Sequence, residues 1–179
     1  MSDYNRIKQM RAFARVDGAY LGLIWIMAFS FFVMQYSNPI MGMVSMLASI
    51  FSLFFAYKRL VKFRTDICDD TINFARAYSY LVFTFFYASV ILGLAQYIYF
   101  KFIDGGYIVN AYAQMASTEE FKAASKAYGM TADSINDALD QMAAVRPVDI
   151  ALNFLSMNVF GSFFLSIPLA FMARKNETK

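Results

Sequence analysis

The chain has 179 residues, of which 59% are hydrophobic and 16% are charged, and its formal net charge is +3. Soluble globular domains usually carry about 25% charged residues, so this composition indicates a membrane protein. The small net charge argues against nucleic acid as a partner. Histidine is absent and Cys68 is the single cysteine, which excludes an intrachain disulfide, a thiolate metal site and the commonest general base. We therefore expect no catalytic residues, no metal site and no cofactor, and a protein that is not an enzyme.

Four segments are long and apolar enough to cross a bilayer as α-helices. A span needs about 20 mostly apolar residues, and backbone groups in hydrocarbon must be paired within the segment, which favours helices. The four segments contain no Asp, Glu, Lys or Arg and cover residues 18–36, 39–57, 77–100 and 150–173. Gln35–Pro39 contains an Asn-Pro turn signal, so the first two spans should form a tight antiparallel hairpin. The predicted fold is all-α, a four-helix transmembrane bundle in a single integral membrane domain over residues 1–179.

Basic residues are distributed unequally between the two sides of this bundle. Twelve of the 16 Lys and Arg residues lie before the first span, between the second and third, or after the fourth. The other side holds Lys101, Lys122, Lys126 and Arg146, which seven acidic residues outnumber. Because positive charge accumulates in cytoplasmic segments, we expect both termini in the cytoplasm. The protein is expected to cross a membrane several times.

Residues 101–149, between the third and fourth spans, form the one long segment outside the apolar spans. Ser117 followed by Glu120 matches a capping box, which predicts the start of a helix. Thr131 or Asp133 can cap a second helix. The segment therefore predicts an extracytoplasmic pair of short amphipathic helices, on the outer membrane surface or over the end of the bundle.

Four basic residues lie directly after the second span: Lys58, Arg59, Lys62 and Arg64. Such a cluster can bind a lipid headgroup or a lipid-linked phosphate, or it can serve only to orient the spans. We favour the second interpretation. Three acids that follow, Asp66, Asp69 and Asp70, resemble a metal-binding group, but on a short turn we expect them to be solvated.

The most polar residues inside or next to the apolar spans are Gln96, Asn153 and Asn158. They can line a headgroup pocket between the third and fourth helices, or they can form hydrogen bonds between helices, which is the interpretation we favour. The absence of charged residues from the middle of every span argues against a proton- or sodium-coupled pump.

Small residues form two faces on the first two spans. Gly18 and Gly22 are four residues apart on the first span, and Ser45, Ser49 and Ser52 line the second. Small residues allow membrane helices to approach closely. The faces suit a homo-oligomer or a partner subunit, but we favour packing within the chain because every span needs a neighbour.

From the second span to its C-terminus the chain carries a series of segments in a fixed order. Ile72–Ala77 (INFARA) enters the third span, Tyr97–Asp104 (YIYFKFID) leaves it, and the stretch from Gly161–Phe163 to Ala173–Lys175 closes the fourth. In this order they resemble the domain of unknown function 4199 family, small membrane proteins found mainly in Bacteroidota. The resemblance implies no activity and no catalytic residues. It does imply an association with a membrane-associated glycosyltransferase similar to polyprenyl-phosphate sugar synthases, because the two genes often lie side by side.

Two functions from different classes are consistent with these features. The first is a non-catalytic accessory or scaffold subunit for a membrane partner, which the resemblance suggests is a glycosyltransferase of lipid-linked sugars. The second is a small oligomeric transporter or lipid flippase, with a polar path formed by Gln96, Asn153 and Asn158. A lipid-sized groove flanked by Arg59 or Lys62 would favour lipid handling, and one exposed flat face would favour a partner. Membrane lipids are expected partners in either case.

Overall fold

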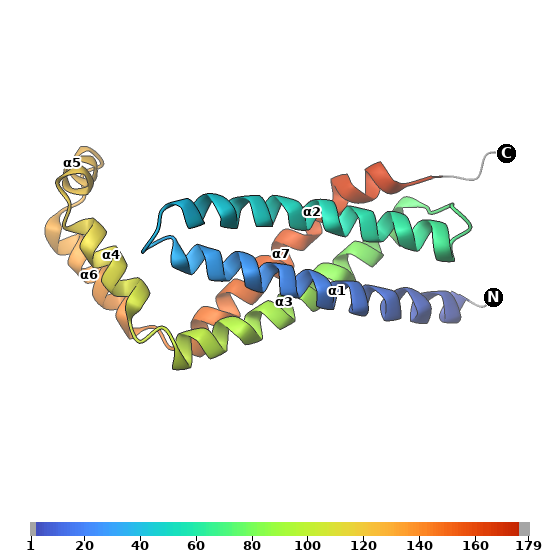
Figure 1. Ribbon diagram of the computed structural model, residues 1–179, viewed down its shortest axis with the longest axis horizontal. Coiled ribbons are helices and arrows are strands. Elements are labelled where there is room, and N and C mark those ends of the chain that lie inside the picture. The colour runs from blue at the N-terminus through green and yellow to red at the C-terminus, as the bar shows by residue number, and fades with distance from the viewer. Residues whose placement is uncertain (1–2, 176–179) are drawn as a thin grey trace. The chain divides into compact units, whose positions relative to one another are not determined.

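The structure is a computed structural model that describes residues 3–175, which form seven α-helices (Figure 1). The prediction of an all-α fold is confirmed. Four helices are long and apolar enough to cross a membrane: α2, α3 and α7 over their whole lengths, and α1 over Asn5–Met34. Lys179, one of the basic residues that predict the orientation, lies outside the described residues. The helices are α1 (Asp3–Met34), α2 (Ile40–Ile67), α3 (Phe74–Phe102), α4 (Tyr107–Ala116), α5 (Glu119–Ala127), α6 (Ala132–Ala144) and α7 (Pro147–Ala173).

The described chain consists of two compact units. The first unit comprises residues 3–95 and 152–175 and contains α1, α2 and most of α3 and α7. The second unit comprises residues 96–151 and contains α4, α5 and α6, with the adjoining ends of α3 and α7.

Helix α1 begins well before the apolar segment that predicts it. The sequence between Asp3 and Gly18 contains neither Pro nor Gly, so no helix-breaking residue interrupts it there. Helix α2 likewise continues past its apolar segment, through the basic cluster, to Ile67. Charged residues at the ends of both spans are therefore helical, and their side chains project from defined sides of α1 and α2.

Small polar side chains hold α1 and α2 together in the predicted antiparallel hairpin (Figure 1). The Trp25 indole Nε1 donates a hydrogen bond to Ser52 Oγ over 3.0 Å, and Ser45 Oγ donates to the Ala28 carbonyl over 2.8 Å. Both serines are buried. Ser45 and Ser52 of the small face of the second span therefore pack within the chain, as predicted, whereas Ser49 is exposed.

Gly18 and Gly22 bring α1 close to α3. A Cβ atom at Gly18 would lie 2.6 Å from the Thr84 carbonyl oxygen and 2.7 Å from Tyr87 Cβ. At Gly22 it would lie 3.0 Å from two carbon atoms of Ile91. The interface between α1 and α3 therefore has no room for a side chain at either glycine. The predicted use of these glycines for packing inside the chain is confirmed.

The core of the first unit lies among these helices. Phe63 of α2 and Tyr80 and Phe85 of α3 are almost fully buried, and the Phe63 and Tyr80 rings stack with their centroids 4.6 Å apart. Helix α7 adds Ala170 and Ala173 to this core. Most of the large apolar side chains of α7 are exposed, as expected for a helix that faces lipid.

The second unit contains three short helices where the sequence predicts two. Helix α4 packs against both α5 and α6. Its N-cap is Gly106, which adopts a left-handed conformation with φ of 86°, and the Asp104 carboxylate accepts a hydrogen bond from the Ile108 N–H over 3.3 Å. The capping carboxylate lies two residues before the N-cap, outside the usual N-cap position, and the sequence therefore does not predict α4.

The N-cap of α5 differs from the prediction by one residue. Thr118 Oγ1 accepts a hydrogen bond from the Phe121 N–H, and Thr118 has the extended conformation of an N-cap. Ser117 cannot serve as the cap because it has helical dihedral angles and closes the C-terminus of α4. Thr131, one of two predicted caps for the next helix, does cap α6.

Candidate functional site

A buried carboxylate joins three helices of the first unit. Asp17 of α1 is only 2% exposed, and it forms an ion pair with the Arg59 guanidinium of α2. It also accepts a hydrogen bond from the hydroxyl of Tyr80 on α3, which is fully buried. We call these three residues the Asp17 cluster. A buried charge is tolerated only when it is paired in this way, so the cluster ties α1, α2 and α3 together.

The Asp17 cluster changes the interpretation of Arg59. The sequence places Arg59 among the candidate lipid contacts, but its guanidinium is used inside the chain. Asp17 is not among the candidate residues that the sequence predicts, because it lies just outside the first apolar segment. One signal could have found it: Asp17 precedes one span of a hairpin and Arg59 follows the other, so both lie at the same end of the hairpin.

A second group of charges holds the end of α7 against the connection between α2 and α3. Arg64 Nε donates to Asp70 Oδ1 over 3.0 Å, and Arg64 Nη1 donates to the Ala173 carbonyl over 2.8 Å. Lys175 pairs with the other Asp70 oxygen and exchanges two backbone hydrogen bonds with Ile72, of 2.9 and 3.0 Å. We call these residues the Asp70 clamp. Arg64, like Arg59, is therefore engaged within the chain.

The acidic turn is only partly the solvated surface that the sequence predicts. Asp66 and Asp69 are exposed. Asp70 instead forms two ion pairs, because Asp69 and Asp70 adopt left-handed conformations with φ of 50° and 57°, which reverse the chain after α2. The hydrogen bond from Lys175 lowers the pKa of the Asp70 carboxyl, and Arg64 acts in the same direction.

Lys58 and Lys62 are the two residues of the predicted basic cluster that remain exposed. The Lys58 ammonium lies 5.3 Å from the centroid of the Phe54 ring, a cation–π contact. Neither lysine forms an ion pair with a described residue. The predicted cluster of four is thus divided into two internal arginines and two exposed lysines.

The three polar residues of the spans lie in different surroundings. Gln96, in the second unit, is 3% exposed, and its Oε1 accepts no hydrogen bond from the described residues. In the first unit, Asn153 is exposed and Asn158 is half-buried. Their predicted role in contacts between helices stays a prediction.

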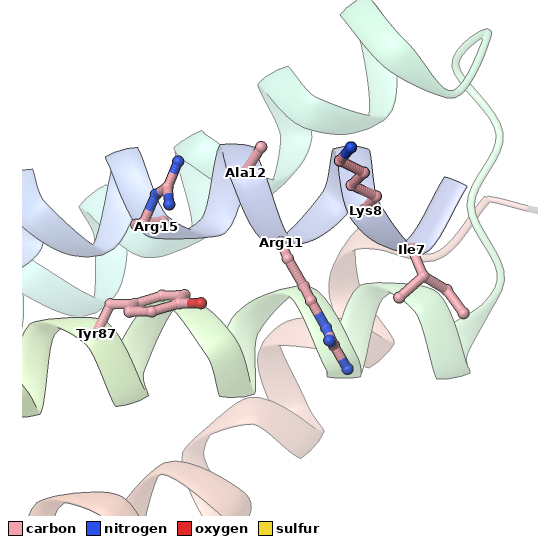
Figure 2. Close-up of a pocket in the computed structure, with 6 residues that line it drawn as sticks. All are labelled: Ile7, Lys8, Arg11, Ala12, Arg15 and Tyr87. Carbon is pink, nitrogen blue, oxygen red and sulfur yellow. The ribbon is translucent and has the colours of Figure 1, made fainter. Parts of the chain in front are cut away.

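A pocket of about 320 Å³ lies beside α1 and α3 in the first unit, and we call it the α1 basic pocket. Lys8, Arg11 and Arg15 lie along one side of α1 because residues three, four and seven positions apart share a helix face. Figure 2 shows Arg11 extending across α3, and the Tyr87 ring lying on α3 below Arg15. The Arg11 guanidinium is 4.9 Å from the centroid of the Phe83 ring. From the sequence, these basic residues predict only the orientation of the spans.

The second unit contains a pocket of about 460 Å³ lined by α4, α5 and α6, the α4–α6 pocket. Ala113, Ile135 and Leu139 supply apolar side chains to its wall, and Lys122 and Lys126 supply charge. Lys122 pairs with Glu119, while Lys126 has no carboxylate partner among the described residues. The pocket is therefore suited to a binding partner in which an acidic group lies next to an apolar group.

Cys68 lies directly after α2 and is buried, with 6% of its surface exposed. Burial raises the pKa of the Cys68 thiol, because the thiolate would lose its hydration. At neutral pH the residue is a protonated thiol, and such a group is a poor nucleophile. Cys68 therefore acts as a packing residue of the α2–α3 connection.

One family of proteins matches this chain over most of its length. The model of the family described as Protein of unknown function (DUF4199) matches residues 17–175, a range that includes both the Asp17 cluster and the Asp70 clamp. The family is the one that the order of sequence segments resembles. No curated protein and no solved structure matches the chain.

Proposed function

Because the chain belongs to the DUF4199 family of proteins of unknown function, we propose its role from its own geometry: it is a non-catalytic accessory subunit for a membrane partner. The proposal of a non-catalytic role is supported by the contacts of three groups that could perform acid–base chemistry. Asp17, Tyr80 and Asp70 are all engaged in contacts between parts of the chain. The partner that we propose to test first is a membrane glycosyltransferase that uses lipid-linked sugars.

The observation that carries the proposal is the lack of a buried core in α4, α5 and α6. No residue of α4 or α6 is buried, and in α5 only Ser125 is. Large apolar side chains such as Met115, Tyr128 and Met130 are exposed, Tyr128 to 83%. Three helices of this size bury too little apolar surface to be stable by themselves. We infer that a partner protein covers them.

The α4–α6 pocket is the place where this partner would bind. Its wall combines half-buried apolar side chains, Ile135 and Leu139, with the unpaired ammonium group of Lys126. An amphipathic partner helix could insert an apolar side chain there and pair an acidic residue with Lys126. Burial of one large apolar side chain contributes about 2 kcal/mol, so this contact would matter for affinity.

A matched pair of charge substitutions tests the proposal. Tagged wild type, Ile135→Glu and Val145→Glu would be cross-linked in native membranes and analysed by quantitative mass spectrometry. Ile135 lines the pocket, whereas Val145 is 41% exposed and does not. We expect a membrane protein to be recovered with wild type and Val145→Glu and to fall about tenfold with Ile135→Glu, on the order of 1.4 kcal/mol. Equal recovery with both variants, or recovery of the chain alone, would contradict the proposal.

We further propose a bacterial inner membrane as the location, with both termini in the cytoplasm. The unequal distribution of basic residues supports this orientation. Replacing Cys68 with Ser and placing a new cysteine at Ser117 or at Lys175 would allow labelling of whole cells with an impermeant maleimide. The expected result is labelling at position 117 and none at position 175; the reverse pattern would invert the topology.

A small oligomeric transporter or lipid flippase is the second candidate. The observation that favours it is the unpaired Oε1 of Gln96, because a buried polar atom without a partner often marks a bound group. Neither of the two pockets described above is lined by Gln96, Asn153 or Asn158. Reconstituted vesicles that transport a lipid or solute equally well after all three are replaced by Leu would eliminate this candidate.

A further inference from the structure

The α1 basic pocket is lined by hydrogen-bond donors and by no acidic side chain. Its polar side chains are the Lys8 ammonium, the Arg11 and Arg15 guanidinium groups, and the Tyr87 hydroxyl. No acidic residue lines it, and none of the four forms an ion pair or a hydrogen bond with a described residue. Three positive charges thus line the pocket without an acidic partner among the described residues, and Figure 2 shows Arg11 extending across α3 while Lys8 and Arg15 extend away from it. An anion is the ligand that would pair with them.

Three other basic residues of the first unit differ in this respect. Arg59 pairs with Asp17, and Arg64 and Lys175 pair with Asp70. Carboxylates therefore pair with the cations that join helices, while the pocket residues, like Lys58 and Lys62, have no carboxylate partner among the described residues. Lys8, Arg11 and Arg15 are all exposed, so a ligand could reach them.

The position of the pocket indicates what kind of anion would bind. Helix α1 carries charged residues up to Asp17 and none from Gly18 to Met34, so the pocket ends where the apolar part of the span begins. Tyr87 of α3 lies level with Gly18, because a Cβ atom on Gly18 would lie 2.7 Å from Tyr87 Cβ. The headgroup layer of a bilayer lies outside the hydrocarbon core and is several ångströms deep, which matches a pocket at the end of a span.

The lining also provides apolar contacts for the rest of the ligand. Ile7 and Ala12 lie beside the cations, and the Tyr87 ring adds an aromatic surface next to a hydroxyl. A volume of about 320 Å³ is near the lower end for small-molecule sites, enough for a phosphate and the glycerol attached to it. We propose that the α1 basic pocket binds the phosphate group of an anionic membrane lipid. This site differs from the basic cluster after the second span, and it does not depend on the presence of a protein partner.

Titration with a short-chain phosphatidylglycerol, followed by native mass spectrometry of the purified chain in detergent, tests the proposal. Arg11→Gln with Arg15→Gln removes two charges from the pocket. Lys101→Gln with Arg174→Gln removes two exposed charges elsewhere and is the matched control. We expect the pocket variant to bind the lipid at least tenfold more weakly, and the control to bind like wild type. Lys8→Gln replaces the double variant if that protein does not purify, with a smaller loss in the same direction.

Two further arms separate the sources of phosphate. Phosphatidylcholine carries the same phosphate without a net negative charge, and we expect it to bind several-fold more weakly. Inorganic phosphate should compete with phosphatidylglycerol only at far higher concentration, because it lacks the apolar part. Equal lipid binding by the pocket variant and wild type, an equal loss in the control, or equal affinity for phosphatidylcholine or inorganic phosphate would overturn the proposal.

Discussion

Asp17 and Arg59 lie 42 positions apart in the sequence, yet their side chains form an ion pair that joins α1 to α2. The carboxylate is almost completely buried, and the arginine side chain is 27% exposed. Tyr80 adds a hydrogen bond from α3, so one carboxylate holds three helices together. This contact stabilises the packing of α1, α2 and α3 against one another.

Breaking this ion pair should destabilise the first unit. Asp17→Asn or Arg59→Gln leaves one member of the pair without its counter-charge, which costs about 3 kcal/mol for a buried pair. Thermal unfolding in detergent would show a large fall in Tm for either variant. The double variant should lose less than the sum of the two single losses, because both share one interaction. Additive losses would show that Asp17 and Arg59 do not act on each other.

Replacement of Gly18 by Ala should destabilise the protein, although Ala is the better helix former by about 1 kcal/mol. The reason is the close contact with α3, where an added Cβ would lie 2.6 Å from the Thr84 carbonyl oxygen. Gly161→Ala on α7 is the control, since nothing lies within 4 Å of a Cβ there. Thermal unfolding should give a lower Tm for Gly18→Ala and an unchanged or higher Tm for Gly161→Ala. The opposite order would be incompatible with close packing of α1 on α3.

The Asp70 clamp should open in acid. The pairing with Lys175 lowers the pKa of Asp70 below its usual value of 3.8, so the folded state binds the proton more weakly than the unfolded state. The stabilisation is therefore fully present above pH 3.8 and is lost as the pH falls through the lowered pKa. Amide protection factors of Ile72 and Lys175, corrected for the intrinsic exchange rate, would report this opening.

Variants of the acidic turn separate the clamp from a general effect of acid. Asp70→Asn should leave the Ile72 and Lys175 amides weakly protected even at neutral pH, because the ion pairs are absent. Asp66→Asn removes an exposed carboxylate and should behave like wild type. Protection that is the same in all three proteins would mean that the backbone bridge alone holds α7.

Thr118 rather than Ser117 should control the start of α5. Thr118→Ala removes the hydrogen bond to the Phe121 N–H and should cost about 1 kcal/mol of local stability. Ser117→Ala removes only a hydroxyl that donates to the Gln114 carbonyl. Hydrogen exchange at Phe121 should be several-fold faster in Thr118→Ala than in Ser117→Ala. Faster exchange in Ser117→Ala would contradict this prediction and would support the capping box that the sequence predicts at Ser117.

Features that depend on the local sequence could be predicted. Apolar length predicts the four candidate spans, the Asn-Pro turn predicts the hairpin, and Gly18 and Gly22 predict a close helix contact. Each rests on the properties of one segment and on the physics of a bilayer, which forces backbone hydrogen bonds to be formed within that segment. The family could also be inferred, because it depends on the order of segments along the chain.

The sequence by itself therefore determined the helical spans of this protein and where its charges lie along the chain. Only the tertiary structure decided which charges meet: Arg59 pairs with Asp17, Arg64 pairs with Asp70, and Lys8, Arg11 and Arg15 line a pocket without acids. These outcomes depend on the rotation and level of each helix against its neighbours, and a shift of one residue turns a side chain by about 100°. Residues of one chemical type in one stretch of sequence can thus have opposite fates, as internal ion pairs or as the lining of an anion site.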